Sequence, residues 1–249
     1  MDTLFISDLH LCEERPEKPT LFKQLLQGPA LKARALYILG DLLENFWLGD
    51  DDHTRASLDA IAALARFSRD GGRLFLLRGN RELMFSRRIE QMSGGTLLPD
   101  STVIELDGRP VLITHGDLLC TRDVKYQLYR RFLERPGVRR FFLRLPYLLR
   151  CVLVRGLRPL MKKSTRRKSP SIVDVDPEAV EAQMRAHGVQ ELIHGHTHRP
   201  GIHEFQLDGA AARRIVLGDW YEKDSILVCR GEQRRLLPLD EYLAEAADA

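Results

Sequence analysis

The chain has 249 residues, of which 44% are hydrophobic, and its 38 basic and 35 acidic side chains leave a formal net charge of +3. This length suits one well-buried domain with an insertion, and the sequence contains no internal repeat or low-complexity tract. No apolar stretch reaches the roughly 18 residues of a membrane-spanning helix, and no signal peptide opens the chain. Its four cysteines are scattered without a C-x-x-C pair, which favours free thiols. We therefore expect a cytoplasmic protein, or one peripheral to the inner face of a membrane.

Short apolar runs alternate with helical apolar spacing early in the chain, and strands dominate the C-terminal part. Helices are predicted over Thr20–Leu26, Leu58–Phe67, Glu82–Met92 and, with Asp176 as N-cap, from Pro177 to Gly188. Strands are predicted at Leu4–Ile6, Leu36–Leu39, Leu74–Leu77, Val103–Leu106, Val111–Thr114, Leu192–Ile193, Ile202–Leu207, Ile215–Leu217 and Ile226–Cys229. The segment 124–170 is predicted to be a helical insertion, which Pro136, Pro146 and Pro159 should break into several short helices.

Five polar clusters each follow one of these apolar runs. They are Asp8-Leu9-His10, Gly40-Asp41, Gly79-Asn80-Arg81, His115-Gly116-Asp117 and Gly195-His196-Thr197-His198. Side chains at the ends of successive buried strands can gather at one edge of a sheet and reach a common point. The candidate metal ligands are therefore Asp8, His10, Asp41, Asn80, His115, His196 and His198.

The chemistry of these seven side chains favours a pair of divalent metals. Imidazole with carboxylate and amide oxygens suits Mn, Fe, Zn or Co, whereas an all-oxygen set suits Mg or Ca. Seven ligands exceed the need of one tetrahedral ion, and a bridging carboxylate, for which Asp41 is the natural candidate, allows two ions about 3.5–4 Å apart. Taken singly, each cluster also fits a turn, a loop, a structural histidine or an exposed strand. Their joint occurrence, always after a strand-like run, favours the metal site.

The order of these motifs resembles the calcineurin-like metallophosphoesterase superfamily, in which D-x-H, G-D, G-N-[HR]-[DE], H-G and G-H-x-H follow one another. The resemblance implies an α/β fold, a four-layer β-sandwich flanked by helices. Residues 1–249 would form a single domain, with 124–170 as a helical cap inserted within it. One ion is assigned to Asp8, His10, Asp41 and His198, and the other to Asp41, Asn80, His115 and His196. The resemblance makes Mn²⁺ the expected metal.

Longer stretches resemble, more closely, the UDP-2,3-diacylglucosamine diphosphatases of lipid A biosynthesis. They are residues 5–11, 35–42, 48–52, 79–81, 115–117 with 119–121 and Asp123, 192–200 and 216–220. This resemblance implies a hydrolase that yields UMP and 2,3-diacylglucosamine 1-phosphate, by attack of a metal-activated water on the nucleotide-side phosphorus. A phosphodiesterase or nucleotide-sugar diphosphatase with a soluble substrate is the alternative enzyme. A phosphoesterase-like scaffold without turnover is the alternative from another class.

The resemblance also implies roles for individual residues. Catalytic roles fall to Asn80, Arg81 and His115, and substrate contacts to Asn80, Arg81, Asp123, Thr165, Lys168 and His196. A forked, always-protonated guanidinium at Arg81 suits stabilisation of phosphoryl oxygens, whereas a salt bridge to Glu82 or a nearby acid is the structural alternative. Met161 stands where relatives carry a small polar group, which leaves sugar recognition open. The roles of His194 and Glu82 are also open.

The insertion is both basic and apolar. Residues 125–168 contain fifteen Lys or Arg and a single acid, Glu134, whereas the rest of the chain is acidic. Basic side chains beside apolar runs suit an anionic bilayer surface and a UDP-linked lipid with two acyl chains. A helical cap packed on its own body explains the same pattern equally well. No nucleic-acid motif accompanies the basic residues, so nucleic acid is not an expected partner, and we expect a monomer.

Overall fold

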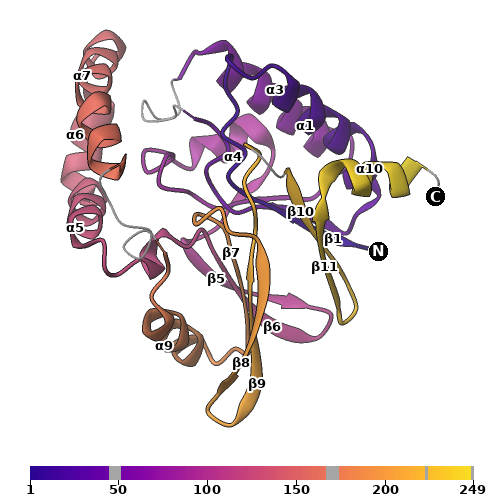
Figure 1. Cartoon of the computed structure of the whole chain (residues 1–249). Helices are drawn as coiled ribbons and strands as arrows, with labels where there is room; N and C mark the ends of the chain where they lie inside the picture. Colours follow the sequence, from indigo (N-terminus) through magenta and orange to yellow (C-terminus); the bar gives the residue numbers. More distant parts are fainter. Residues whose placement is uncertain (45–51, 167–173, 222–223, 248–249) are drawn as a thin grey trace.

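The computed structural model of the chain describes residues 1–44, 52–166, 174–221 and 224–247, and for 157–166 it describes the backbone only. Two β-sheets form the centre of the molecule, and helices pack against their outer faces (Figure 1). The strand order is β11-β10-β1-β2-β3-β4 in the first sheet and β5-β6-β7-β9-β8 in the second.

The first sheet is parallel through its middle strands and carries an antiparallel strand beside them. Its strands are β1 (Thr3–Ile6), β2 (Ala35–Ile38), β3 (Leu74–Leu76), β4 (Thr96–Leu97), β10 (Ser225–Arg230) and β11 (Gln233–Pro238). β1 to β4 pair in parallel, and β10 pairs antiparallel with both β1 and β11. The carboxyl ends of β1, β2 and β3 therefore open at the same edge.

The second sheet has a parallel centre and an antiparallel hairpin at each side. Its strands are β5 (Ser101–Leu106), β6 (Arg109–Thr114), β7 (Glu191–His194), β8 (Gly201–Leu207) and β9 (Ala210–Val216). β6, β7 and β9 pair in parallel, whereas β5 and β8 pair antiparallel with β6 and β9. Asp107-Gly108 and Asp208-Gly209 make the two hairpin turns, and all four residues have the positive φ that a tight two-residue turn requires.

Alternation along the strands divides the core into layers. Phe5 of β1 lies in a buried cluster between the two sheets, whereas its neighbours Leu4 and Ile6 pack in a cluster with the helices over the first sheet. A third cluster joins the far face of the second sheet to one helix. The four layers confirm the predicted α/β sandwich.

The helices are α1 (Glu17–Gln27), α2 (Pro29–Lys32), α3 (Arg55–Arg69), α4 (Arg88–Ser93), α5 (Val124–Leu133), α6 (Pro136–Arg144), α7 (Tyr147–Arg166), α9 (Pro177–His187) and α10 (Leu239–Ala247), with a 3₁₀ turn, η2 (Asp117–Leu119).

Most predicted helices are present, and one is shorter than predicted. The structure confirms the helices around Thr20–Leu26, around Leu58–Phe67 and from Pro177, where the Asp176 side chain caps the first turn. The helix predicted over Glu82–Met92 begins only at Arg88. Its expected first turn is a loop because the Glu82 carboxylate accepts backbone hydrogen bonds from neighbouring loops instead of facing solvent on a helix.

The segment after Asp123 forms α5, α6 and α7, which lie along one side of the molecule (Figure 1). Pro136 starts α6 and Pro146 precedes α7, as predicted from their missing N–H groups. Pro159, in contrast, does not break the chain into a further helix, because α7 runs through it to Arg166. The prediction at Pro159 was therefore wrong; strong helix formers such as Leu157, Arg158 and Leu160 flank this proline and favour continuation.

Candidate metal centre

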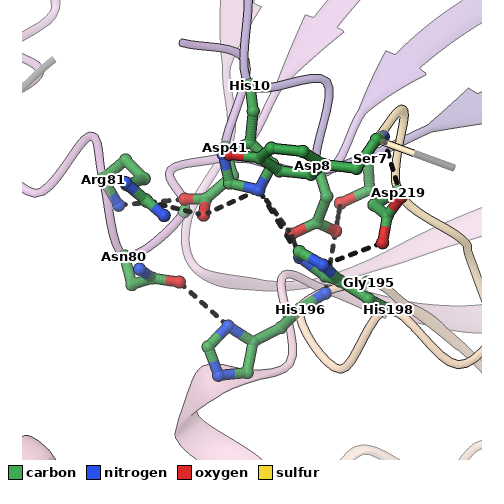
Figure 2. A network of polar contacts seen from close by, with 12 residues as sticks. Ser7, Asp8, His10, Asp41, Asn80, Arg81, Gly195, His196, His198 and Asp219 are labelled. Carbon is green, nitrogen blue, oxygen red and sulfur yellow. Dashed lines mark hydrogen bonds and ion pairs between the residues drawn. The ribbon is translucent and has the colours of Figure 1, made fainter. Parts of the chain in front are cut away.

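The seven candidate ligands follow five strands of the two sheets at the ends where those strands open together. Asp8 and His10 follow β1, Asp41 follows β2, and Asn80 follows β3; His115 follows β6, and His196 and His198 follow β7. All seven side chains take part in one network of polar contacts, most of which Figure 2 shows. The convergence predicted from the order of the strands is present.

The backbone at these positions adopts an uncommon conformation. Five of the eight non-glycine residues with positive φ in the described part of the chain are ligand candidates: Asp8, His10, Asp41, His196 and His198. Such a conformation costs a non-glycine residue on the order of 1–3 kcal/mol and persists where the surroundings fix it. Here the N–H groups of Asp8 and His10 each donate to the loop after β2, at 3.0 Å.

Two positions in the motifs require glycine because other side chains lie too close to their backbone for a Cβ atom. A Cβ atom at Gly79 would collide with the Asp41 carboxylate, and one at Gly195 would collide with Ser7 and with the Asp8 carboxylate. Both carboxylates are therefore held against bare backbone at the strand ends.

One group of donors surrounds the space between His10 and His198. The Nε2 atoms of these two imidazoles lie 3.4 Å apart, and the Nε2 of His198 lies 3.2 Å from Oδ1 of Asp8. The Nε2 of His10 is 3.8 Å from carboxylate oxygens of both Asp8 and Asp41. Ring nitrogens and carboxylate oxygens that face one another at these distances form a donor set that fits one cation.

A second group of donors lies on the other side of the Asp41 carboxylate. Oδ1 of Asp41 is 3.7 Å from Nε2 of His115, whereas Oδ2 of Asp41 faces His10. Oδ1 of Asn80 is 3.1 Å from the same His115 nitrogen and 2.9 Å from Nδ1 of His196. Asp8 also lies within reach of Asp41 and His115. The two oxygens of Asp41 thus point to two adjacent donor sets, the arrangement that a shared carboxylate needs.

Oxygen atoms lie behind three of the imidazoles, on the side away from the centre. Nδ1 of His115 donates to the carbonyl of Leu39 at 2.7 Å, and Nδ1 of His198 lies 2.9 Å from Asp219. Nδ1 of His10 lies 3.2 Å from Oε2 of Glu44, within ion-pair distance but outside hydrogen-bond geometry. A hydrogen held on Nδ1 leaves the Nε2 lone pair facing the centre, which is the usual arrangement of metal-binding histidines. The residues present therefore fit divalent metal ions.

Sequence reasoning missed Asp219 and Glu44 as partners of the imidazoles. Asp219 follows the strand predicted at Ile215–Leu217, so its place after a strand was an available signal. Glu44 follows Asp41 by three residues within a loop and carries no such signal.

Burial and neighbouring charge set the protonation of the centre. Burial alone would raise the pKa of Asp8, but the hydrogen bond to His198 and the nearby His115 and His10 lower it well below its ordinary value. Burial, followed by the proximity of His115, lowers the pKa of His196 to about 4. At neutral pH, Asp8 is therefore a carboxylate and His196 a neutral imidazole, the protonation states that metal binding requires.

Glu82 and His194, whose roles the sequence left open, take structural positions. Oε2 of Glu82 accepts the N–H groups of Asp41 at 2.7 Å and Gly79 at 3.0 Å, so this side chain joins two ligand loops. Burial and the charge of Asp41 raise the pKa of Glu82 to about 8. His194 is fully buried and its Nδ1 donates to the carbonyl of Gly195 at 2.8 Å, while burial lowers its pKa to about 3.

The residues expected to contact substrate have mixed outcomes. Arg81 lies at the centre, with Nη1 3.0 Å from Oε1 of Glu44 and Nε 3.6 Å from Asp41; within the described part of the chain, these two carboxylates are its ion-pair partners. Asp123 caps α5 by accepting the N–H of Tyr126 at 3.2 Å. Lys168, the side chains of Met161 and Thr165, and residues 48–51 of the motif at 48–52 lie outside the described residues.

The start of α5 reaches the centre through contacts that the sequence did not reveal. The Tyr126 ring stacks on that of His196 with 6.5 Å between centroids, and its hydroxyl donates to Asp117. Asp117 is also paired with Arg130, which is buried and lies 2.7 Å from Asp100. The helix after Asp123 is thereby joined to the loop that carries His115.

A search of the described residues for a helix with the length and hydropathy of a membrane span finds none.

Comparison with known proteins gives consistent matches along the chain. The family model for calcineurin-like phosphoesterases matches residues 1–200. A protein of Aeromonas hydrophila subsp. hydrophila named UDP-2,3-diacylglucosamine hydrolase is 48% identical over 235 residues, covering 94% of this chain and 97% of that protein. A protein of the same name from Aeromonas salmonicida is 49% identical, covering 96% and 95%. Among solved structures, an archaeal phosphodiesterase is similar with a TM-score of 0.47 and 13% identity, covering 96% of this chain and 99% of that one.

Proposed function

This chain belongs to the calcineurin-like phosphoesterase family, and from that premise we propose that it hydrolyses the diphosphate bond of UDP-2,3-diacylglucosamine. The products are UMP and 2,3-diacylglucosamine 1-phosphate, which makes the protein an enzyme of lipid A biosynthesis. The convergence of seven ligand side chains supports the phosphoester chemistry. The identity of 48% over 94% of the chain to a UDP-2,3-diacylglucosamine hydrolase supports the substrate.

The family implies divalent metal ions, and the two donor sets fit them. One ion would be held by Asp8, His10, Asp41 and His198, and the other by Asp41, Asn80, His115 and His196. Mn²⁺ is the proposed metal, because imidazole mixed with carboxylate and amide oxygen suits it. When bound, such cations supply Lewis acidity, which acidifies water and neutralises charge on phosphoryl oxygens.

The remaining catalytic work falls to side chains at the rim of the centre. The Arg81 side chain is 25% exposed, so its guanidinium can reach a bound phosphoryl group from the position it holds beside Asp41. A planar, permanently charged fork there stabilises the negative charge that develops on the phosphoryl oxygens. Asn80 and His115 lie 3.1 Å apart, so both would border the reacting phosphorus. Asp123, Thr165, Lys168 and His196 would contact the substrate, as in the family.

The helices α5 to α7 would receive the acyl chains and meet the inner membrane surface. Phe141, Leu148 and Val152 are 67%, 77% and 66% exposed, and they lie among the basic residues of this segment. Apolar side chains interleaved with arginines suit an anionic bilayer surface, from which a lipid substrate can be taken. The proposed location is therefore the cytoplasm, peripheral to the inner membrane, and the proposed state is a monomer.

Turnover of two substrates tests the proposed reaction. The protein loaded with Mn²⁺ should cleave UDP-2,3-diacylglucosamine much faster than the soluble UDP-N-acetylglucosamine, because only the former carries acyl chains. In ¹⁸O-labelled water the label should appear in UMP, since attack occurs at the nucleotide-side phosphorus. Equal rates on both substrates would instead indicate a soluble nucleotide-sugar diphosphatase. Absence of turnover by a fully metallated preparation would favour a scaffold.

Sedimentation with vesicles tests the membrane proposal. The protein should bind vesicles that contain phosphatidylglycerol and bind pure phosphatidylcholine weakly. Replacing Phe141, Leu148 and Val152 together by serine should reduce binding, whereas Ile202→Ser, at an exposed apolar residue on β8, should not. Binding that is indifferent to the triple substitution would exclude α6 and α7 as the docking surface.

A further inference from the structure

Glu44 lies where side chains from three parts of the chain meet. Its Oε1 is 3.0 Å from Nη1 of Arg81, and its Oε2 is 3.2 Å from Nδ1 of His10. Oε2 also accepts a hydrogen bond from the hydroxyl of Tyr221 at 2.6 Å. One carboxylate therefore contacts a candidate metal ligand through one oxygen and the guanidinium at the rim through the other.

Further contacts hold this carboxylate in place. The Tyr221 ring packs against the ring of His10, with 4.9 Å between the centroids, and the guanidinium of Arg15 lies over the Tyr221 ring, 3.6 Å from its centroid. The N–H of Tyr221 donates to Asp219 at 2.8 Å. The carbonyl of Glu44 itself accepts a hydrogen bond from Arg81 at 3.0 Å. Glu44 is thus fixed from both its backbone and its side chain.

These contacts meet two separate requirements of the chemistry. A histidine that binds a metal through Nε2 needs its hydrogen on Nδ1, and a carboxylate acceptor there fixes the tautomer and raises the basicity of the ligand. A guanidinium that stabilises phosphoryl charge acts best when it is already oriented, because the cost of ordering its long side chain is then met before substrate binds.

We propose that Glu44 is a positioning residue for the reaction, orienting the His10 imidazole through one carboxylate oxygen and the Arg81 guanidinium through the other. The proposal rests on the proposed function of the same site. Glu44 binds neither metal nor substrate in this scheme, and it acts through its two neighbours. Tyr221 supports the oxygen that faces His10.

The test separates the two effects by two readouts. Glu44→Gln keeps the shape of the side chain and removes its charge and one acceptor. Calorimetric titration with Mn²⁺ in the absence of substrate reports on His10, and kcat and KM at saturating Mn²⁺ report on Arg81. The same substitution is also made in an Arg81→Ala background. Glu181→Gln, at a glutamate that pairs with Arg185 on the surface of α9, is the matched control.

We expect Glu44→Gln to weaken Mn²⁺ binding by about 10- to 100-fold, the usual effect of removing the partner of a ligating histidine. We expect it to lower kcat when Arg81 is present and to leave kcat unchanged when Arg81 is already alanine. Tyr221→Phe, which removes only a hydroxyl, should also weaken Mn²⁺ binding, but by a smaller factor than Glu44→Gln. Glu181→Gln should change neither quantity.

Either of two results overturns the proposal. One is wild-type affinity for Mn²⁺ in both Glu44→Gln and Tyr221→Phe. The other is a loss of kcat of equal size with and without the Arg81 side chain. If the wild-type protein does not turn over the diacyl substrate, the proposed function fails, and the Mn²⁺ titrations still decide whether Glu44 orients His10.

Discussion

Nδ1 of His198 lies 2.9 Å from a carboxylate oxygen of Asp219, while Nε2 of the same ring lies 3.2 Å from Asp8 (Figure 2). The imidazole is thus held between two carboxylates of different function. Asp219, behind the ring, is the acceptor for Nδ1, and Asp8 shares the centre with Nε2. Burial alone would lower the pKa of His198, but Asp219 and Asp8 raise it to about 10, so a metal ion that binds Nε2 must replace the proton held there at neutral pH.

Asp219→Asn should therefore weaken metal binding without removing a ligand. The amide is a poorer acceptor for Nδ1–H and can also donate, so the orientation of the His198 ring and its basicity both suffer. We expect a loss of about 10- to 100-fold in Mn²⁺ affinity, measured by titration. Asp208→Asn, in an exposed hairpin turn, should leave the affinity unchanged. Equal affinities in the two variants would assign Asp219 a role in folding only.

Asp41→Asn tests whether one carboxylate serves two ions. The oxygens of Asp41 face His10 and His115, at 3.8 and 3.7 Å, and an amide leaves only one of the two positions as an oxygen. Elemental analysis should find fewer than two metals per chain, and turnover should be abolished. Asp107→Asn is a close control because Asp107 and Asp41 have φ of 51° and 52°. Two metals retained in Asp41→Asn would contradict the shared ligand.

Arg81→Lys should lower turnover while the metal content stays intact. Lysine keeps the positive charge but lacks the forked geometry that binds two phosphoryl oxygens at once. Loss of one preorganised donor to developing charge costs about 10²- to 10³-fold in kcat. Rate measurement beside elemental analysis of the same sample checks both statements. An unchanged kcat would limit Arg81 to a structural role through its contacts with Glu44 and Asp41.

The sequence predicted the sandwich and the convergence of the seven candidate ligands because both depend on local patterns. Runs such as Leu4–Ile6 identify buried strands, and polar side chains directly after parallel strands must lie at one edge. What the sequence could not supply depends on distant partners. Asp219 becomes informative only once His198 is beside it, and Arg130 reads as one more basic residue of the insertion until Asp117 and Asp100 are seen around it.

The wrong predictions have similar causes. Helical spacing at Glu82–Met92 is real, but the first turn is lost because Glu82 accepts three backbone hydrogen bonds, two of them from the distant loop after β2 and one from Gly79 in its own loop. Proline usually ends a helix, but the residues around Pro159 are strong helix formers, and α7 continues through this position.

Arg130→Ala should destabilise the fold, whereas Arg131→Ala should not. Arg130 is buried and paired with Asp117, Asp100 and Glu134, while its neighbour Arg131 is exposed. Removing one partner of a buried ion pair leaves an uncompensated charge and costs about 3–5 kcal/mol in the free energy of unfolding. Replacing an exposed arginine usually changes the free energy of unfolding by no more than about 0.5 kcal/mol. Urea unfolding of both variants decides; similar midpoints would mean that Asp117 is satisfied without Arg130.

Cys229 and Cys151 should differ in reactivity towards iodoacetamide. Cys229 is 1% exposed, and burial raises the pKa of its thiol to about 12, whereas Cys151 on α7 is partly exposed. Because the thiolate is the reacting form, peptide mass spectrometry of the folded protein at pH 8 should find Cys151 alkylated and Cys229 intact. Denaturant should make both react. Labelling of Cys229 as fast as Cys151 would show that its strand opens readily.

The same shift of the Cys229 pKa predicts a loss of stability at alkaline pH. The folded pKa lies above the ordinary value of 9.0, so the unfolded chain releases this proton first as the pH rises. The contribution of the buried thiol is therefore complete below pH 9 and declines as the pH rises towards 12. Cys229→Ala has no such proton, so its free energy of unfolding should fall less between pH 8 and pH 10.5 than that of the wild-type protein. Denaturant unfolding at the two pH values measures the difference, and parallel declines would mean that the thiolate of Cys229 is tolerated in the folded state.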